Sequence, residues 1–144
     1  MRSCDPILLV EDDLIDIMTL KRGLKEIHVH NPLYVSHDGE AALDFLRDPK
    51  EPKPALIFLD LNMPRMNGIE FLQIIKNDPH WRIIPVVVFT TSQEEQDRLA
   101  SFALGVAGYI VKPLSYPDFV EHLKVIYQYW RDRKSTRLNS SHEF

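Results

Sequence analysis

The feature that most constrains this chain is a regular alternation of short apolar runs with longer segments of helical period. Five apolar runs are found, at residues 7–10, 33–35, 55–59, 84–89 and 108–111. Such alternation is typical of βα units, in which helices cover a parallel sheet. Val, Ile, Leu and Phe fill most of the first, third and fourth runs, which predicts central strands covered on both faces. The second run is shorter and has more polar neighbours, so we expect an edge strand there.

The first two helical segments lie on either side of the second run. The first spans about 13–27, and its apolar residues are predicted to form one buried face: Leu14, Ile17, Met18, Leu20, Leu24 and Ile27. Asp13, at its start, is expected to be an N-cap. The second helix is shorter, with Asp38 as its predicted N-cap, and it should end before Pro49.

The third and fourth helices carry start signals of one kind. Asn67 and Glu70 are spaced as a capping box, and Ser92 and Glu95 repeat that spacing. Gly105 predicts the end of the fourth helix. The apolar residues predicted to form the buried side of the third helix are Ile69, Phe71, Leu72 and Ile75. The fourth helix is predicted to continue through Leu99, Phe102 and Ala103 toward Gly105.

The fifth helix is predicted to be capped by Ser115, with Leu114 and Phe119 forming a hydrophobic staple. Its core stripe is predicted to contain Phe119, Leu123, Ile126 and Trp130. A monomer would leave a second apolar edge wet, made of Tyr116, Val120 and Tyr127. We therefore hypothesise that the last two helices and the last strand form a face for homodimerisation or partner docking.

The chain is long enough for one domain. Its 144 residues, 44% of them hydrophobic, allow a single core, and we expect the domain to span residues 1–134. The last ten residues, STRLNSSHEF (135–144), have neither periodicity nor an apolar face. We predict a disordered tail there, and its sequence resembles that of a cloning or sequencing adapter.

Charge and cysteine content narrow the class of partner. The net charge of −4 provides no basic field that would attract nucleic acid or an anionic membrane. Cys4 is the only cysteine, which excludes an internal disulfide and fits a reducing compartment. Acids at 11–13 come too early for the apolar core of a signal peptide, and no apolar run approaches the ~20 residues of a membrane span. We expect a cytoplasmic protein whose partners are proteins or small solutes.

Polar residues follow the predicted strands at the point where each strand ends. In an open α/β sheet the functional crevice lies at the carboxyl ends of the strands. The residues that this rule brings together are Glu11, Asp12 and Asp13 after the first run, Asp60 and Asn62 after the third, Thr90, Thr91 and Ser92 after the fourth, and Lys112 and Pro113 after the fifth. One small volume therefore receives several carboxylates, hydroxyls and an ammonium.

This set of groups favours magnesium and phosphate chemistry. Packed carboxylates raise one another's pKa unless a cation neutralises them, and Mg²⁺ prefers oxygen ligands of this kind. Lys112 can contact a phosphoryl group as a point charge, and Thr90 can donate a hydroxyl hydrogen bond to it. Asp60 lies centrally among these groups and is the candidate nucleophile, because carboxylates form aspartyl phosphates.

Four motifs in fixed order resemble the receiver domain of two-component response regulators, the CheY-like family. They are LLVEDD, LIFLDLNMPRMNG, PVVVFTTS and GYIVKP, and the resemblance covers residues 6 to about 130. It implies a doubly wound, five-stranded parallel sheet of order 2-1-3-4-5 with helices on both faces. It also implies that a histidine kinase, or a small phosphodonor such as acetyl phosphate, supplies the phosphoryl group.

The resemblance assigns roles to individual residues. Asp60 resembles the phospho-acceptor, Lys112 the phosphate-contacting lysine, and Thr90 and Tyr109 the switch pair. The bond between Lys112 and Pro113 would be cis. The switch would signal through a conformational change and protein contacts.

The implied metal is Mg²⁺. Asp12 resembles its direct ligand, Glu11 the second acid, and Asp60 and the backbone carbonyl of Asn62 the remaining protein ligands. Asn62 and Ser92 also occupy positions that tune dephosphorylation in the family. The segment NDPHWRIIPVVVFTTS, the proline-bearing loop before the third run and the absence of an output domain resemble stand-alone regulators that serve phytochrome-type histidine kinases.

Two other classes were weighed against this one. A Mg²⁺-dependent phosphohydrolase of the haloacid-dehalogenase type also forms an aspartyl phosphate, but it needs an acid two residues after the nucleophile, where this chain has Asn62. It also needs a substrate cap, for which the chain is short. A flavodoxin-like flavin carrier would need a phosphate cradle after the first strand, and the acids of EDDLID would repel that anion. A signalling switch that is not an enzyme is therefore expected.

Overall fold

A computed structural model describes residues 4–112 and 115–133 of the chain. Within them, five parallel strands form one sheet in the order β2-β1-β3-β4-β5. The elements in chain order are β1 (Ile7–Val10), α1 (Leu14–Glu26), β2 (Leu33–Ser36), α2 (Gly39–Arg47), β3 (Leu56–Leu59), α3 (Gly68–Lys76), β4 (Val86–Thr90), α4 (Glu95–Ala103), β5 (Gly108–Val111) and α5 (Tyr116–Arg133). The predicted doubly wound fold and strand order are confirmed.

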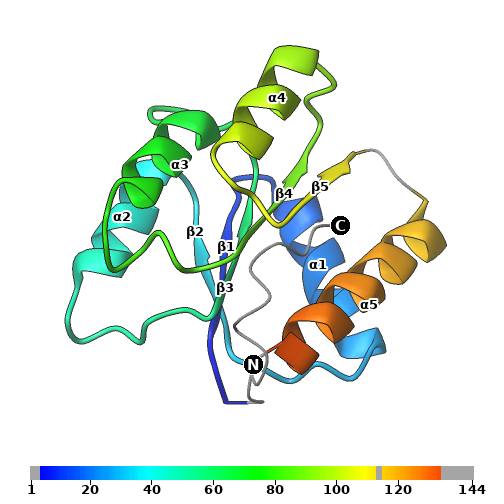
Figure 1. Cartoon of the computed structure of the whole chain (residues 1–144). Helices are drawn as coiled ribbons and strands as arrows, with labels where there is room; N and C mark the ends of the chain where they lie inside the picture. Colours follow the sequence, from blue (N-terminus) through cyan, green and yellow to red (C-terminus); the bar gives the residue numbers. More distant parts are fainter. Residues whose placement is uncertain (1–3, 113–114, 134–144) are drawn as a thin grey trace.

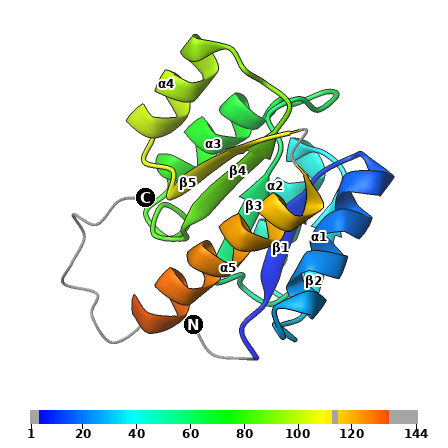
Figure 2. The same cartoon turned by 90° about the vertical axis from the view of Figure 1, so that its right-hand side faces the viewer.

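The sheet lies between two helical layers. Helices α1 and α5 cover one face, and α2, α3 and α4 lie on the other (Figures 1 and 2). Alternate residues of each central strand feed the two cores: Ile7 and Leu9 pack with α1 and α5, whereas Leu8 and Val10 pack with α2 and α3. Strands β1, β3 and β4 are buried along their whole length, and β2 is a half-buried edge, as predicted.

Most predicted helix starts are confirmed by their hydrogen bonds. Asp13 accepts from the Asp16 amide at 3.1 Å, and Asp38 accepts from the Ala41 amide at 2.8 Å. Both bonds of the Asn67–Glu70 capping box are present. Ser115 Oγ accepts from the Asp118 amide at 3.2 Å. Leu114 of the predicted staple, Pro113 and the tail 135–144 lie outside the described residues.

The predicted start of the fourth helix is wrong. Its N-cap is Glu94, which makes no side-chain capping bond, and α4 begins at Glu95. Ser92 Oγ instead donates to Asp97 Oδ2 at 2.6 Å. The hydroxyl is committed to a carboxylate one turn into the helix and does not cap the amide of Glu95.

One prediction of burial, for the face of α1, is wrong in part. Leu14 and Met18 of α1 are 68% and 59% exposed, because the face of the helix that packs on the sheet carries the buried residues Ile17, Leu20, Gly23 and Leu24. In α4, Leu99 and Phe102 are 58% and 41% exposed, and Ser101 is the buried residue of the helix. Helix α4 therefore presents apolar side chains to solvent beside the edge strand β5.

The second apolar edge predicted for α5 is half-buried in the monomer. The Tyr116 hydroxyl donates to Glu26 Oε1 at 2.9 Å, and the Arg22 guanidinium lies 4.0 Å from the centre of the Tyr116 ring. The Tyr127 hydroxyl reaches Asn31 at 3.5 Å. These tyrosines are half-buried and face the α1 side of the molecule, away from β5. The predicted core stripe of α5 is confirmed, with Phe119 buried.

Candidate functional site

Three carboxylates meet at the carboxyl ends of β1 and β3. Val10 and Leu59 are paired in register, so the residues that follow them emerge side by side. Oxygens of Glu11, Asp12 and Asp60 all lie within 4.8 Å of one another. Glu11 and Asp60 are 1% and 5% exposed, whereas Asp12 is exposed. Two buried acids at this spacing need compensating charge, because like charges in a poorly hydrated site destabilise one another.

Lys112 supplies part of that charge from the end of β5. Its ammonium donates to Glu11 Oε1 at 2.9 Å and to Asp16 Oδ2 at 2.6 Å. The Lys112 side chain is 7% exposed. Burial lowers the pKa of Lys112, but the hydrogen bonds to Asp16 and Glu11 outweigh it and the net pKa is raised. The Lys112 ammonium therefore keeps its positive charge at the crevice.

Glu11 is the acid that burial perturbs most clearly. Desolvation raises its pKa from 4.5 to about 7, and the nearby charge of Asp60 adds to the increase. The hydrogen bond from Lys112 and the backbone amide of Asp13 act in the opposite direction. Desolvation wins, so the site holds one carboxyl group that titrates near neutral pH when no other cation is bound.

The loop after β3 fixes the position of Asp60. The Asn62 amide donates to Asp60 Oδ1 at 3.2 Å. The Gly68 amide donates to the Leu61 carbonyl at 3.0 Å, which closes the loop onto the start of α3. A Cβ atom at Gly68 would lie 2.6 Å from the Asp60 carbonyl oxygen, so only glycine fits here. The glycine that ends LIFLDLNMPRMNG therefore has a direct steric role beside Asp60.

A second tie holds the same loop against α2. Arg65, with φ of 61°, pairs with Asp38, the buried N-cap of α2. The Ala41 amide and the Arg65 guanidinium lower the pKa of Asp38. The side chain of Met66 packs against Gly39, where an added Cβ would lie 2.9 Å from it. The loop that follows Asp60 is thus held to α2 by an ion pair and a side-chain contact.

Thr90, at the end of β4, faces the loop that carries Asn62. Thr90 is fully buried, and its hydroxyl oxygen lies 3.5 Å from Asn62 Nδ2. The side-chain amide of Asn62 also donates a shorter bond, 2.9 Å, to Thr91 Oγ1. The amide of Ser92 donates to Thr90 Oγ1 at 3.2 Å. The Thr90 hydroxyl is thus held between two strand ends.

Tyr109 contacts the start of the β4–α4 segment. It is half-buried on β5, and its hydroxyl donates to the Ser92 carbonyl at 3.3 Å. Ser92 therefore contacts Thr90 through its amide, Tyr109 through its carbonyl and Asp97 through its hydroxyl. Because one residue joins all three, the start of the β4–α4 segment links the predicted switch pair.

A cavity of about 490 Å³ opens beside the acids. It is lined by Asp12, Leu61, Asn62, Met63, Pro64, Asn67, Ile69 and Asp97. The donors that meet here, Glu11, Asp12 and Asp60, are all carboxylate oxygens, which suits a hard divalent cation. The close spacing of the three acids and the burial of Glu11 and Asp60 fit such an ion, since it would neutralise charges that Lys112 balances only in part.

Comparison with known families settles the class of protein. The family profile described as the response regulator receiver domain matches residues 7–124. The chain belongs to the response regulator receiver family. Its function is that of a two-component response regulator.

Known relatives of this receiver domain agree in sequence and in structure. Response regulator Rcp1 of Synechocystis is 40% identical over 128 residues, which are 86% of this chain and 87% of Rcp1. The crystal structure of the Mn²⁺-bound form of Rcp1 is 38% identical with a TM-score of 0.80 and covers 88% of this chain and 94% of that one. The phosphorylated cyanobacterial phytochrome response regulator RcpA is 36% identical with a TM-score of 0.80 over the same shares.

Sequence reasoning missed several residues of the receiver domain's site. Asp16 follows Asp12 by one helical turn, a spacing that could have placed it at the crevice. Arg65 and Asp38 are 27 residues apart, and no local pattern connects them.

Within the described residues, none of the helices combines the length and hydropathy that crossing a membrane requires.

Proposed function

We propose that this receiver domain accepts a phosphoryl group on Asp60 from a sensor histidine kinase and signals through a phosphorylation-dependent change in its protein contacts. The observation that carries the proposal is the position of Asp60. Its carboxylate lies within 4.8 Å of Glu11 and of Asp12, which lines the neighbouring cavity, and the ammonium of Lys112 is paired to Glu11. An acid so placed can attack phosphorus while neighbouring groups balance the charge of the phosphoryl oxygens.

The transfer is an exchange of one bond for another. A carboxylate oxygen of Asp60 attacks the phosphorus of a phosphohistidine, the P–N bond breaks, and its electron pair stays on the ring nitrogen. Lys112 and Thr90 are proposed to contact the phosphoryl oxygens, and Thr90 and Tyr109 to act as the switch pair. Movement of Thr90 toward the phosphoryl group would remove the acceptor of the Ser92 amide, which connects the event to the Tyr109 hydroxyl.

Mg²⁺ is the proposed cofactor. Glu11, Asp12, Asp60 and the backbone carbonyl of Asn62 are the residues that would hold it. When bound, the ion supplies positive charge to the phosphoryl oxygens. The crystal structure of Rcp1 with Mn²⁺ supports a divalent cation in a related receiver.

The proposed kinase is of the phytochrome type. Support comes from the names of similar proteins, among them the phytochrome response regulator RcpA and the bacteriophytochrome response regulator RtBRR, which is 43% identical. Leu14, Ile15 and Met18 on α1, each at least 59% exposed, form an apolar patch next to Asp12 and Asp13. A kinase that presents phosphohistidine to Asp60 has to cover this rim, so the patch is its proposed docking surface.

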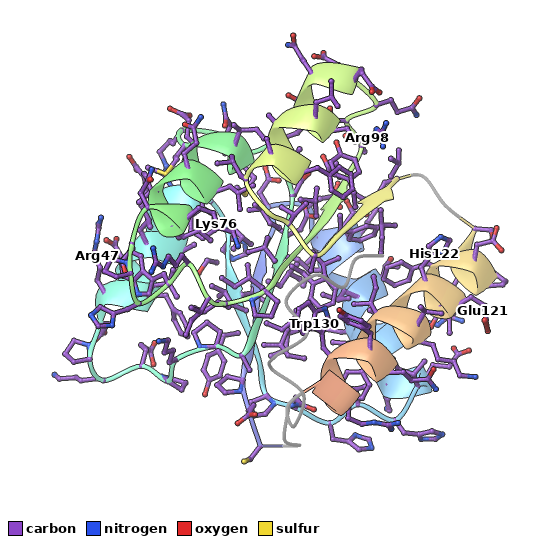
Figure 3. All side chains as sticks on the ribbon, viewed as in Figure 1. Arg47, Lys76, Arg98, Glu121, His122 and Trp130 are labelled. Atoms are coloured by element: carbon purple, nitrogen blue, oxygen red, sulfur yellow. The ribbon has the colours of Figure 1, made fainter. Side chains whose placement is uncertain are left out.

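A homodimer through α4, β5 and α5 is proposed as the route of signalling. A cavity of about 540 Å³ is lined by Phe102, Gly108, Tyr109, Ile110, Glu121, His122, Val125 and Ile126. Figure 3 shows Arg98 on α4 and Glu121 and His122 on α5, on either side of the edge strand β5. Val125 is 54% exposed. Exposed apolar groups around an open sheet edge, beside the switch residue Tyr109, suit a self-complementary contact.

The phosphohydrolase alternative has less support. Its general acid would stand at Asn62, whose side chain is an amide bonded to Thr91. We therefore propose that the only chemistry of this chain is its own phosphorylation and dephosphorylation. We also propose that residues 1–134 form one cytoplasmic domain that binds no nucleic acid and no membrane.

The test is phosphorylation by acetyl phosphate with Mg²⁺, read as the intact mass. We expect one labile phosphoryl group on the wild-type chain and none on Asp60→Asn or in the presence of chelator. Absence of both phosphorylation and beryllofluoride binding would contradict the proposal.

Sedimentation of the phosphorylated form tests the proposed homodimer. Val125→Glu should abolish dimer formation, while Ile83→Glu, at an exposed position outside α4, β5 and α5, should not.

A further inference from the structure

Lys112 makes no hydrogen bond or ion pair with Asp60 in the described part of the chain. Among the described residues, the hydrogen-bond acceptors of its ammonium are Glu11 Oε1 at 2.9 Å and Asp16 Oδ2 at 2.6 Å. The shorter bond goes to Asp16, a residue of α1 to which the motifs assign no role. Asp16 reaches Lys112 from the first turn of the helix, and its side chain is 24% exposed.

The position of Asp16 determines what it can do. It is tied to α1, whose N-cap Asp13 accepts a hydrogen bond from the Asp16 amide at 3.1 Å. The carboxylate is therefore presented from a fixed backbone, outside the group of Glu11, Asp12 and Asp60 whose oxygens lie within 4.8 Å of one another. An anion that binds Lys112 from outside the metal-binding acids competes with any phosphoryl oxygen for the same ammonium.

We infer that Asp16 is a positioning residue that holds the Lys112 ammonium on the α1 side of the crevice until a phosphoryl group on Asp60 competes for it. The inference rests on the proposed function, since it takes Asp60 as the phosphoryl acceptor. A charged hydrogen bond of 2.6 Å in a mostly buried site is a strong one, and part of it has to be given up when the ammonium turns to a new anion. Asp16 thereby makes the phosphorylated state less favourable, and it lowers the affinity of the site for a phosphoryl analogue.

The step that Asp16 controls is the reorientation of Lys112. A lysine ammonium has three donors, of which Glu11 and Asp16 occupy two. Glu11 is fixed at the end of β1 and can keep its bond, whereas Asp16 lies nearer to solvent, where water can replace the ammonium. Replacing Asp16 by a phosphoryl oxygen as a partner of Lys112 thus costs less free energy than replacing Glu11.

Beryllofluoride affinity at saturating Mg²⁺, measured by calorimetry, tests the inference. Asp16→Asn keeps the shape of the side chain and removes its charge, so it should bind beryllofluoride about three- to tenfold more tightly than the wild type. Asp16→Glu restores the charge and should return the affinity toward the wild-type value. Mg²⁺ affinity is measured separately for each variant, so that a change in metal loading is not mistaken for a change at Lys112.

Asp13→Asn is the matched control. It removes one negative charge three residues earlier on the same helix, and asparagine preserves the N-cap. Its beryllofluoride affinity should stay within about twofold of the wild type, because Asp13 does not contact Lys112. Tighter beryllofluoride binding by Asp16→Asn could not be explained by a local folding defect, because such a defect would weaken binding.

The outcomes separate this inference from the proposed function. Unchanged or weaker binding by Asp16→Asn would overturn the holding role, and so would equal gains in Asp16→Asn and Asp13→Asn. Failure of the wild-type chain itself to bind beryllofluoride would overturn the proposed function, and the role of Asp16 with it. Tight wild-type binding with no effect at Asp16 would leave the proposed function standing and reject the inference alone.

Discussion

Lys112 and Glu11 form a buried ion pair that joins the carboxyl ends of β5 and β1. The Lys112 Nζ atom lies 2.9 Å from Glu11 Oε1, and the two side chains are 7% and 1% exposed. Breaking such a pair leaves one charge buried without compensation, which is more costly than the net contribution of the intact pair. The strand ends are thus held together by the same group that is proposed to contact the phosphoryl oxygens.

Removal of the ammonium should destabilise the metal-free protein. We expect Lys112→Met to lower the free energy of unfolding by about 3 kcal/mol at pH 8, because Glu11 then has to stay buried as a carboxylate without its partner or take up a proton from solution. At pH 5 Glu11 carries a proton and the loss should be smaller. Urea denaturation at both pH values measures the difference. Lys76→Met is the control, because the Lys76 ammonium donates to the Arg82 carbonyl and not to an acid. An equal loss at both pH values would contradict the prediction.

The raised pKa of Glu11 should make the stability of the metal-free protein depend on pH. Its pKa is about 7 in the folded chain against an ordinary value of 4.5. Between these values the folded state keeps a proton that the unfolded state releases, so stability is fully present below pH 4.5 and is lost as the pH rises through 7. The loss from this group is on the order of 3 kcal/mol. Thermal melts in chelator from pH 4.5 to 8 measure it, and Glu11→Gln should flatten the profile.

The affinity for Mg²⁺ should rise with pH, in the direction opposite to the stability of the metal-free protein. A divalent ion needs the ionised form of Glu11, so its binding displaces the proton that the metal-free site holds at pH 6. We expect Mg²⁺ affinity to rise about tenfold between pH 6 and 8. Calorimetric titration at the two pH values provides the measurement. The same affinity at both would show that Glu11 does not exchange a proton for the ion, and Glu11→Gln should lose most of the dependence.

Gly68 should be intolerant of a side chain. In Gly68→Ala the new Cβ would lie 2.6 Å from the Asp60 carbonyl oxygen and the Leu61 Cα, both backbone atoms that cannot move away independently. We expect a loss of about 2–3 kcal/mol and weaker beryllofluoride binding, because the loop that carries Asp60 has to shift. Gly105→Ala is the control: φ there is +81°, but nothing lies within 4 Å of an added Cβ. It should cost about 1 kcal/mol and leave beryllofluoride affinity unchanged.

Ser92→Ala should loosen the β4–α4 segment without touching the acids. The substitution removes the 2.6 Å bond to Asp97 and the 3.4 Å bond that the Ser92 hydroxyl oxygen accepts from the Glu94 amide. It keeps the amide that reaches Thr90 and the carbonyl that Tyr109 contacts. We expect faster amide exchange over residues 92–95 and a loss of about 1 kcal/mol in stability. Asp97→Asn retains an acceptor for the hydroxyl and should have a smaller effect. Equal exchange in wild type and Ser92→Ala would show that the bond to Asp97 does not restrain the segment.

Local pattern was sufficient for the elements and for the gathering of the acids. Period and composition placed every strand and helix to within a few residues. The rule that parallel strands end at one edge brought Glu11, Asp12 and Asp60 together, because it depends on strand order and not on detailed packing. Helix caps such as Asp13 and Asn67 were predictable for the same reason, since a cap bonds to an amide three residues away.

Local pattern failed where orientation decides the outcome. Leu14 and Met18 share the helical spacing of Ile17, but the face of α1 that packs on the sheet leaves them exposed. Ser92 has the spacing of a cap, yet its hydroxyl has a carboxylate acceptor in Asp97 and takes it. In both places the tertiary environment offered an alternative that the adjacent residues do not record.

The sequence by itself therefore determined the fold, the family and the identity of the acids at the strand ends. Only the tertiary structure decided which carboxylate holds Lys112, because Asp16 lies 96 residues earlier in the chain and reaches it through the placement of α1. The same holds for the contact of Arg65 with Asp38. The physical reason is one of range: hydrophobic period and capping act between near neighbours, whereas the pairing of charges depends on how separate elements pack in space.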